Sequence, residues 1–351
     1  MKRSRWRHRT IVATVAALVI TMSACGSKDD AVRSLTLVAY DSFTPPDGAF
    51  DEFTRRTGIE VKIALAGDTG EMVAKAALTA GNPEGDVMWG VDNTLLSRAL
   101  GADVFDPYVS DAAQLSDELV ATAAGAVTPV DFGDVCVNYD IAALAALGLE
   151  PPTSWDDLRD PKYANLLVTP SASASSVGLA FLLASVAEFG DSGWESYWQS
   201  LVDNGMLVVD GWTEAYYTEF SRYGGTRPLV VSYATSPPAE VIFADPPLAE
   251  TAPATTDIVE STCFRQIEYT GVLRGTDHVD EARELVDYLV SPEFQTLLPE
   301  SIFVYPSNTD VELPDSFVRY AVVVDDPLTM DADTIESNRQ QWVEKWTQIV
   351  S

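Results

Sequence analysis

Short stretches with the residue spacing of strands and helices follow one another along the chain from about residue 35. Apolar runs and alternation of apolar with polar residues predict strands, whereas apolar residues repeated every three or four positions predict helices. In the first third of the chain the predicted strands are 35–40, 60–65 and 86–91, and the predicted helices are 50–57, 71–80 and 94–100. Strands that alternate with helices predict a mostly parallel sheet with ligand groups at the strand ends.

The same rhythm returns in the second half of the chain. The predicted elements there are helices at 177–189, 194–204 and 282–289 and strands at 206–209, 229–233 and 263–273. Residues 127–139, between the two blocks, are rich in strand formers and predict a crossing between two lobes. Near the end, apolar residues at helical spacing predict a helix that docks on the body. They are Trp342, Val343, Trp346, Ile349 and Val350.

This organisation predicts an α/β protein of two lobes. We assign residues 34–130 and 265–310 to lobe 1 and residues 131–264 to lobe 2. Residues 311–351 form a C-terminal helical segment that packs on the lobes.

The first 24 residues have the features of an export signal. A basic head at residues 2–9 precedes an apolar stretch at 11–22, which is too short for a stable membrane span. The sequence Met22-Ser-Ala-Cys25-Gly-Ser27 then resembles a bacterial lipobox, in which the chain is cleaved before a diacylated cysteine. We therefore predict a lipoprotein signal peptide at 1–24, a lipid anchor on Cys25 and a tether at 25–33. The alternative is an ordinary signal anchor with a cysteine there by chance.

The charge of the chain restricts its partners. It has 53 Asp and Glu against 22 Lys and Arg among 351 residues, a net charge of −31, and loss of the five basic residues of the signal peptide leaves −36. Such a surface repels phosphate backbones, which argues against nucleic acid and favours a cationic or zwitterionic ligand. The two histidines are His8, within the signal peptide, and His278. They are too few for a multi-histidine metal site, so we predict no metal.

The two remaining cysteines are predicted to form a disulfide. Apart from Cys25, the chain contains only Cys136 and Cys263, so a single intramolecular pair is available. Export places this pair in an oxidising compartment, which favours the bond. The alternative is two buried free thiols.

The sequence contains no recognisable catalytic motif. It has no Gly-x-Ser-x-Gly elbow, no phosphate-binding lysine loop and no His-Glu-x-x-His. The adjacent acids Asp156-Asp157 and Asp325-Asp326 are interpreted as solvated surface. Paired tyrosines can bind ferric iron, so Tyr216-Tyr217 keeps an iron site open as an alternative. We predict a binding protein without a cofactor, rather than an enzyme.

Aromatic residues at the ends of predicted strands indicate a binding cage. Tyr40, Trp212, Tyr233, Phe303 and Tyr305 come from four separate segments. Each one alone fits a core position, but together they suit a flat or cationic heterocycle, with about 0.5–2 kcal/mol for each cation–π contact. Polar turns at 67–70, 171–176 and 235–236 lie beside them. The backbone N–H groups at a helix start favour an anion there; the alternative is that these turns are ordinary helix N-caps.

Several of these segments are similar to the thiamine-binding proteins of bacterial ABC importers. The matching segments are 40–43, 90–93, 130–133, 211–216, 232–237, 289–295 and 304–306, and the resemblance extends from Leu35 to Ile349. It implies a type II periplasmic-binding-protein fold, with two α/β lobes and a ligand cleft between them.

The resemblance also implies which residues bind the ligand. Tyr40, Trp212, Tyr233 and Phe303 would line the aromatic part of the site, and the polar or phosphate end would be held by Gly67, Asp68, Ser173, Thr235 and Ser236, with Asp41 beside Tyr40. Phe303 stands where a relative has Trp, and Pro238 and Ala239 stand where an aromatic residue is expected. These departures leave thiamine, its phosphates and a related pyrimidine as alternatives.

From the resemblance we predict a monomeric receptor that is lipid-anchored on the outer face of the cytoplasmic membrane. It would capture thiamine or a thiamine phosphate and deliver it to an ABC permease with a cytoplasmic ATPase. The alternatives are a ferric-iron or polyamine receptor of the same fold and an exported enzyme.

Overall fold

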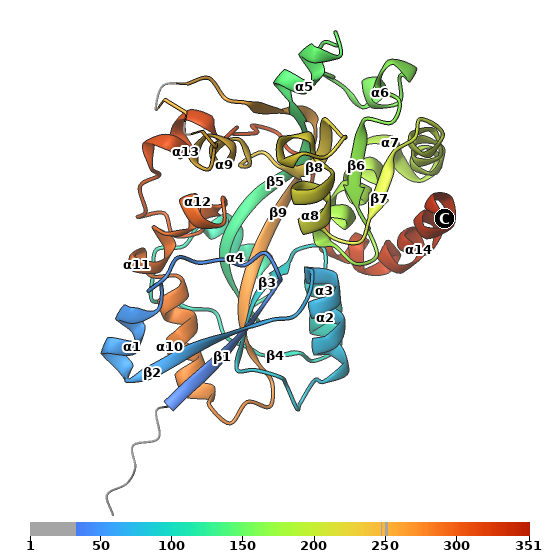
Figure 1. The fold of residues 1–351 in the computed structure, drawn as a ribbon. Helices are drawn as coiled ribbons and strands as arrows, with labels where there is room; N and C mark the ends of the chain where they lie inside the picture. Colours follow the sequence, from blue (N-terminus) through green and yellow to red (C-terminus); the bar gives the residue numbers. More distant parts are fainter. Residues whose placement is uncertain (1–32, 247, 250–251) are drawn as a thin grey trace, which may run out of the picture.

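The computed structural model describes residues 33–246, 248–249 and 252–351 (Figure 1). The predicted signal peptide and Cys25 lie outside these residues. The strands are β1 Arg33–Ala39, β2 Ile59–Leu65, β3 Val87–Asp92, β4 Phe105–Asp106, β5 Thr128–Asp140, β6 Leu167–Pro170, β7 Leu207–Val209, β8 Leu229–Tyr233, β9 Thr256–Leu273 and β10 Tyr305–Pro306. Strand β1 thus includes Arg33, the last residue of the predicted tether.

Fourteen α-helices accompany these strands in the described part of the chain. They are α1 Asp51–Thr57, α2 Thr69–Leu78, α3 Leu96–Gly101, α4 Asp117–Thr122, α5 Ile141–Ala146, α6 Trp155–Leu158, α7 Ser176–Asp203, α8 Trp212–Glu214, α9 Pro237–Ile242, α10 Val279–Leu289, α11 Pro292–Gln295, α12 Leu298–Ser301, α13 Asp315–Tyr320 and α14 Ala332–Val350. Three short helical turns are η1 Pro161–Tyr163, η2 Ala215–Glu219 and η3 Ser221–Tyr223. Within the described ranges, no helix has the length and apolar character needed to cross a membrane.

The strands form one mixed sheet rather than the mostly parallel sheet that the sequence predicted. Its order is β2-β1-β3-β9-β5-β8-β6-β7, with β10 on β5 and β4 on β9. Strand β1 is parallel to β2 and β3, and β6 is parallel to β7 and β8. Between these two parallel ends, β9 and β5 are antiparallel to each other and to their outer neighbours. Alternation of side chains reports a strand but not its direction, so this part of the prediction was wrong.

Strands β5 and β9 connect the two lobes of the molecule. They contain 13 and 18 residues, and their pairing extends from Thr128 opposite Thr270 to Asp140 opposite Thr256. We call the part around β1–β4 with α1–α4 and α10–α12 the first lobe, and the part around β6–β8 with α5–α9 the second lobe (Figure 1). The predicted boundaries at 130/131 and 264/265 fall inside the two long strands, and they stay a prediction.

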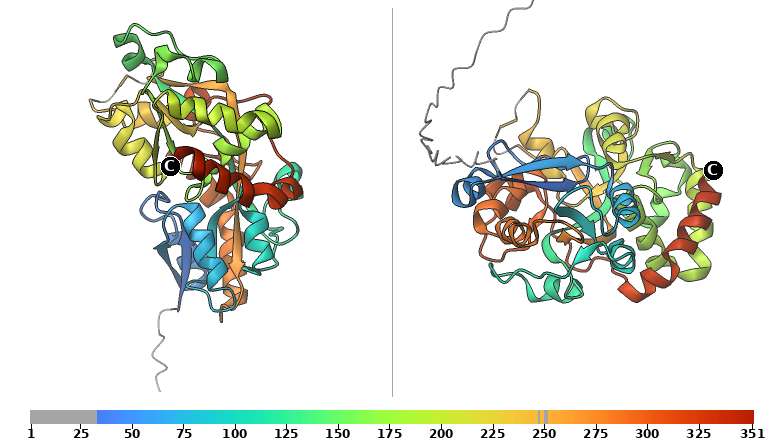
Figure 2. Two further views of the ribbon diagram at one scale, coloured as in Figure 1. Left: turned by 90° about the vertical axis from the view of Figure 1, so that its right-hand side faces the viewer. Right: turned by 90° about the horizontal axis from the view of Figure 1, so that it is seen from below.

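The beginning of the described chain lies far from the second lobe. Strand β1 starts at Arg33, at the end of the first lobe that points away from β6–β8 (Figures 1 and 2). It ends at Ala39, so that Tyr40 and Asp41 follow at the edge facing the second lobe.

The predicted disulfide is present between the two long strands. Cys136 of β5 and Cys263 of β9 form an S–S bond, and both residues are buried. The strand pairing shifts register between Val135 and Val137, next to this bond. The cross-link therefore joins neighbouring strands at an irregularity of the sheet.

Helix patterns read from the sequence are confirmed where they bury one face. The predicted face of α10 is fully buried, with Ala282, Leu285, Val286 and Leu289 each 0 % exposed. Helix α7 is broken at Gly190, between the two helices that the sequence predicted.

The C-terminal docking helix is also present. It corresponds to α14, where Trp346 meets Trp198 of α7 edge-to-face at 5.6 Å between ring centroids. Figure 2 shows α14 lying between α7 and the first lobe, where it contacts α3.

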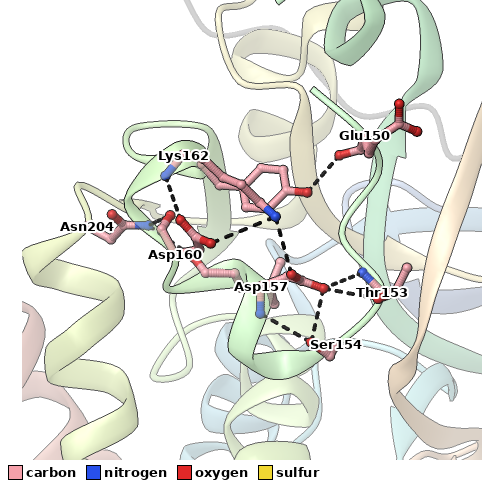
Figure 3. Close-up of polar contacts among 9 residues, drawn as sticks. Glu150, Thr153, Ser154, Asp157, Asp160, Lys162 and Asn204 are labelled. Atoms are coloured by element: carbon pink, nitrogen blue, oxygen red, sulfur yellow. Dashed lines mark hydrogen bonds and ion pairs between the residues drawn. The ribbon is translucent and has the colours of Figure 1, made fainter. Parts of the chain in front are cut away.

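One of the acids interpreted as solvated surface instead fixes a loop of the second lobe (Figure 3). The carboxylate of Asp157 accepts hydrogen bonds from Thr153 N and Oγ1 and from Ser154 Oγ at 2.9, 3.1 and 3.0 Å, and Lys162 Nζ lies 3.6 Å away. The bond from the Thr153 amide is the main cause that lowers the pKa of Asp157. Asp156, its neighbour, is exposed as predicted.

Candidate functional site

A cavity of about 420 Å³ lies between the two lobes. This volume is within the range of roughly 300–1,000 Å³ that is typical of small-molecule sites. Seven of the ten residues predicted to bind ligand line it. They are Tyr40, Asp41, Asp68, Trp212, Tyr233, Ser236 and Phe303.

The first lobe contributes Tyr40 and the turn before α2. Tyr40 follows β1, and its ring lies against Gly90 of β3. A Cβ at position 90 would come within 2.3 Å of Tyr40 Cε1, and the residue has φ +90°, so glycine is required there. Asp68 caps α2 by accepting a hydrogen bond from Thr69 N at 2.7 Å. Glycine at position 90 therefore makes room for an aromatic wall of the cavity.

The second lobe supplies Trp212 on a stack of aromatic rings. Trp212 stacks on Tyr216 with 5.0 Å between centroids and 20° between planes. Its Nε1 donates to Ser232 Oγ at 2.9 Å. The ring of Tyr233 stands 6.5 Å from Trp212 at 62°. These contacts fix the indole face that lines the cavity.

A buried carboxylate behind the stack holds Tyr216 in place. Glu240 of α9 accepts hydrogen bonds from the hydroxyls of Tyr216 and Tyr223 at 2.7 and 3.1 Å and from Arg222 Nε at 3.1 Å. We call Tyr216, Arg222, Tyr223 and Glu240 the Glu240 network. Within the network Tyr216 lines the cavity and supports Trp212, whereas Arg222, Tyr223 and Glu240 do not line the cavity.

The Glu240 network also bears on the iron alternative at Tyr216-Tyr217. Burial, together with the charge of Glu240, holds the pKa of Tyr216 well above its usual value, which disfavours the phenolate that iron requires. Among residues 33–246, 248–249 and 252–351, no group of three or more His, Cys, Asp or Glu side chains is arranged to hold a metal ion.

The inner wall of the cavity is acidic, a feature that the sequence reading missed. Glu268 of β9 lines the cavity, and its Oε2 accepts a hydrogen bond from Tyr40 OH at 3.1 Å. Two residues earlier on the same face, Gln266 accepts from Tyr233 OH at 2.7 Å and donates to Asp92 Oδ2 at 2.6 Å. Asp131 of β5 is the register partner of Glu268. We call Asp92, Asp131, Gln266 and Glu268 the acidic floor.

Burial changes the proton affinity of the acidic floor. It raises the pKa of Asp92 to about 6. Burial, with the charges of Asp131 and Asp92, also raises the pKa of Glu268 well above its usual value, and burial does the same to Asp131. A signal was present in the sequence, because Gln266 and Glu268 are polar residues at a spacing of two in a predicted strand. It could not be interpreted without knowing which face of β9 meets the cleft.

Hydrogen bonds join the two lobes beside the cavity. Trp212 N donates to Asp68 Oδ2 at 3.1 Å, and Thr213 Oγ1 donates to Asp41 Oδ1 at 3.3 Å. Burial is the main cause that raises the pKa of Asp68. Since each bond connects a turn of the first lobe with α8 of the second, the structure has a closed arrangement of the lobes.

Phe303 lines the cavity in an unusual backbone conformation. It has φ +56°, which is uncommon for a residue with a side chain. Its ring meets Phe243, which follows α9, edge-to-face at 5.6 Å. The cavity lining therefore includes an aromatic pair, with one residue from the segment after α12 and one from the second lobe.

Three predicted ligand residues do not line this cavity. Gly67 is not among the lining residues, and its carbonyl accepts a hydrogen bond from Asp41 N at 3.0 Å. Thr235 is fully buried. Ser173 is exposed and lines a second hollow of about 370 Å³ with Arg98 and Arg339. Ser176, at the start of α7, lines the main cavity instead. Roles for Gly67, Ser173 and Thr235 in ligand binding stay predictions.

Comparison with known proteins assigns the chain to a protein family. Residues 83–323, more than half of the chain, match the family model described as bacterial extracellular solute-binding protein. The thiamine-binding periplasmic protein of Salmonella typhimurium is 26% identical over 337 residues, covering 93% of this chain and 96% of its own length. The thiamine-binding periplasmic protein of Escherichia coli is 26% identical over 335 residues, covering 90% and 93%.

Solved structures agree on the fold. A periplasmic thiamin binding protein superposes with a TM-score of 0.78 at 24% identity, covering 91% of this chain and 96% of its own. The ferric binding protein from Campylobacter jejuni superposes with a TM-score of 0.71 at 15% identity, covering 90% and 99%. Proteins named for different ligands thus share one fold.

Proposed function

Because this chain belongs to the bacterial extracellular solute-binding proteins, we propose that it is the thiamine receptor of an ABC importer. It captures thiamine or a thiamine phosphate outside the cytoplasm and delivers it to a permease that is driven by a cytoplasmic ATPase. The observation that carries the proposal is the cavity itself, where aromatic rings from both lobes face a buried acidic wall.

The chemistry of thiamine suits this combination. Thiamine contains a flat aminopyrimidine and a thiazolium ring with a permanent positive charge. Tyr40, Trp212 and Tyr233 offer ring faces for stacking and cation–π contact. Glu268 offers a carboxyl group at the inner end. The negative charge of the whole chain further favours a cation over an anion.

The receptor works by binding and not by catalysis. A ligand that contacts both lobes stabilises the closed arrangement over the open one, because only the closed arrangement provides all of its contacts. The bonds from Trp212 N to Asp68 and from Thr213 to Asp41 then form along with ligand capture. Closure presents a changed surface to the permease.

Attachment to the membrane through Cys25 is a further part of the proposal. The lipobox-like sequence at 22–27 supports it, as does the periplasmic location named for the relatives. Mass spectrometry of the protein purified from the membrane fraction tests it. A tryptic N-terminal peptide that begins at an acylated Cys25 is expected, and an unmodified Cys25 would contradict the anchor.

Calorimetric titration with thiamine tests the proposed ligand. Thiamine, thiamine monophosphate and thiamine diphosphate are titrated in parallel, with spermidine and ferric citrate as comparison ligands for the polyamine and iron alternatives. Trp212→Ala is expected to lower the affinity for thiamine at least about tenfold, because it removes one ring face. Trp342→Phe, on α14, serves as the matched control and retains the affinity. Saturable binding of spermidine or iron without binding of thiamine would overturn the proposal.

A further inference from the structure

Two carboxyl groups of the acidic floor lie side by side without a donor for one of them. Asp131 and Glu268 are directly opposite each other in the antiparallel pair of β5 and β9. Asp131 is 0 % exposed, and neither of its carboxyl oxygens has a hydrogen-bond partner in the described part of the chain. The carboxyl group of Glu268 lies within interaction range of Asp131. Two carboxylates can only accept hydrogen bonds, so these two groups form a hydrogen bond with each other only when one of them carries a proton.

The surroundings of this pair contain acids and phenols but no available cation. The groups that face it are Tyr40 after β1, Asp68 before α2, Asp92 of β3 and Tyr233 of β8. Arg265 lies on the same strand as Glu268, but its Nε donates to Asp134 at 2.6 Å. None of the ion pairs formed by the described residues includes Asp131 or Glu268. Bare negative charge at this depth is strongly unfavourable, so the empty cavity keeps at least one proton on the pair.

Glu268 is the member of the pair that a ligand can reach. It lines the cavity, whereas Asp131 lies behind it and does not. Its Oε2 is also held by Tyr40 OH, which lines the same cavity. A positive group that enters the cavity therefore meets Glu268 first.

We infer that Glu268 binds the cationic group of the ligand and that this cation displaces the proton shared with Asp131. This inference rests on the proposed function for its ligand, the thiazolium of thiamine. The step balances in charge, because one positive charge enters the cavity and one proton leaves to solvent. No covalent bond to the ligand forms or breaks. The pair thereby selects a charged ring over a neutral ring of the same shape.

The sign of the pH effect follows from this exchange. With the cavity empty, the proton is held to a higher pH than with a cation bound, since the cation stabilises the carboxylate. The lower limit is the pKa of the pair with the cation bound, and the upper limit is its pKa in the empty cavity. Between these two pKa values the affinity for thiamine rises about tenfold for each pH unit, because one proton is released for each ligand bound. Above the upper limit the affinity becomes independent of pH.

Calorimetry in buffers of different ionisation enthalpy measures the released proton directly. Thiamine is compared with 3-deazathiamine, in which a neutral thiophene replaces the thiazolium. Wild-type protein is expected to release about one proton with thiamine and none with the neutral analogue, and to prefer thiamine at least about tenfold. Equal affinity for the two compounds, or no proton release with thiamine, would overturn the inference while leaving the proposed function intact.

Variants separate the two acids. Glu268→Gln is expected to abolish both the proton release and the preference for thiamine over 3-deazathiamine. Asp131→Asn supplies a donor to Glu268 in place of the proton, so it is expected to abolish the release but keep the preference. Glu188→Gln on α7 removes an exposed negative charge that does not line the cavity, and this variant is expected to retain both readouts. A Glu268→Gln protein that still discriminates fully would contradict the role of Glu268.

The shared proton has a signature that needs no ligand. The infrared spectrum of the unliganded protein is expected to contain a protonated-carboxyl C=O band that shifts in D2O and is lost in Asp131→Asn. Absence of this band would show that Asp131 and Glu268 share no proton, whether or not thiamine binds. Failure of thiamine to bind wild-type protein, with the band present, would instead overturn the proposed function.

Discussion

The second lobe and the acidic floor both contain buried acids, but these acids differ in the number of hydrogen-bond donors that they have. Glu240 accepts from two tyrosine hydroxyls and one arginine, so its charge is fully compensated. Glu268 accepts from Tyr40 alone, and its neighbour Asp131 has no donor among the described residues. A buried acid with a full set of donors holds the scaffold in one conformation. A buried acid without a full set of donors remains able to bind a ligand that enters the cavity.

The largest effect that tests this contrast is removal of Glu240. Glu240→Ala leaves Arg222 and two tyrosine hydroxyls without their acceptor, and breaking such a buried pair costs about 3–5 kcal/mol. Urea denaturation followed by circular dichroism measures the free energy of unfolding. A decrease in the free energy of unfolding of less than about 1 kcal/mol would show that the Glu240 network contributes little to stability. Glu284→Ala, at an exposed position of α10, is the control.

The disulfide offers a second test, because it joins the same two strands that carry Asp131 and Glu268. The bond closes a loop with a sequence separation of 127, and loss of such a bond costs about 2–4 kcal/mol. The double variant Cys136→Ser with Cys263→Ser is expected to unfold at lower urea but to bind thiamine with little change. A large loss of affinity with unchanged stability would contradict this division of roles.

Asp131→Asn is expected to act in the opposite direction on stability. Burial raises the pKa of Asp131 and of Glu268, so the native state holds protons that the unfolded chain gives up above its ordinary pKa of about 4. Stability of the unliganded protein is therefore fully present below about pH 4 and falls as the pH rises through the raised values. At neutral pH the variant should be more stable by about 1–3 kcal/mol.

Urea denaturation between pH 4 and pH 8 measures this slope in wild type and variant. The slope in the range near pH 6 also contains the contribution of Asp92, whose pKa burial raises to about 6. A wild-type protein whose stability rises steadily with pH would contradict the sign.

The smallest effect concerns Tyr216, which links the Glu240 network to the cavity. Tyr216→Phe removes one hydrogen bond to Glu240 and keeps the ring that stacks on Trp212. The expected loss of stability is about 1 kcal/mol, with only a few-fold loss of thiamine affinity. Fluorescence titration measures the affinity. A loss as large as that of Trp212→Ala would show that the hydroxyl, rather than the ring, serves the ligand.

Local patterns in the sequence predicted local structure well. The buried face of α10, the docking helix α14 and the break of α7 at Gly190 each depend on residues close together in the chain. The aromatic lining was also visible, since Tyr40 and Tyr233 stand at the ends of β1 and β8. These features need only periodicity and turn chemistry.

Features that depend on the pairing of strands far apart in the chain could not be predicted from the sequence. The antiparallel pairing of β5 with β9 joins segments more than one hundred residues apart, and it alone places Asp131 beside Glu268. Ser173 was predicted in the cavity, but α7 begins at Ser176, so this later residue faces the cavity. A shift of three residues cannot be decided from a Ser/Ala run in which each position has similar chemistry.

The position of Arg33 has a mechanical consequence. The described chain enters the molecule at the far end of the first lobe, so a restraint on its start acts on that lobe directly and reaches the second lobe only through β5, β9 and α14. A change in the angle between the lobes, about β5 and β9, therefore leaves the start of the described chain in place.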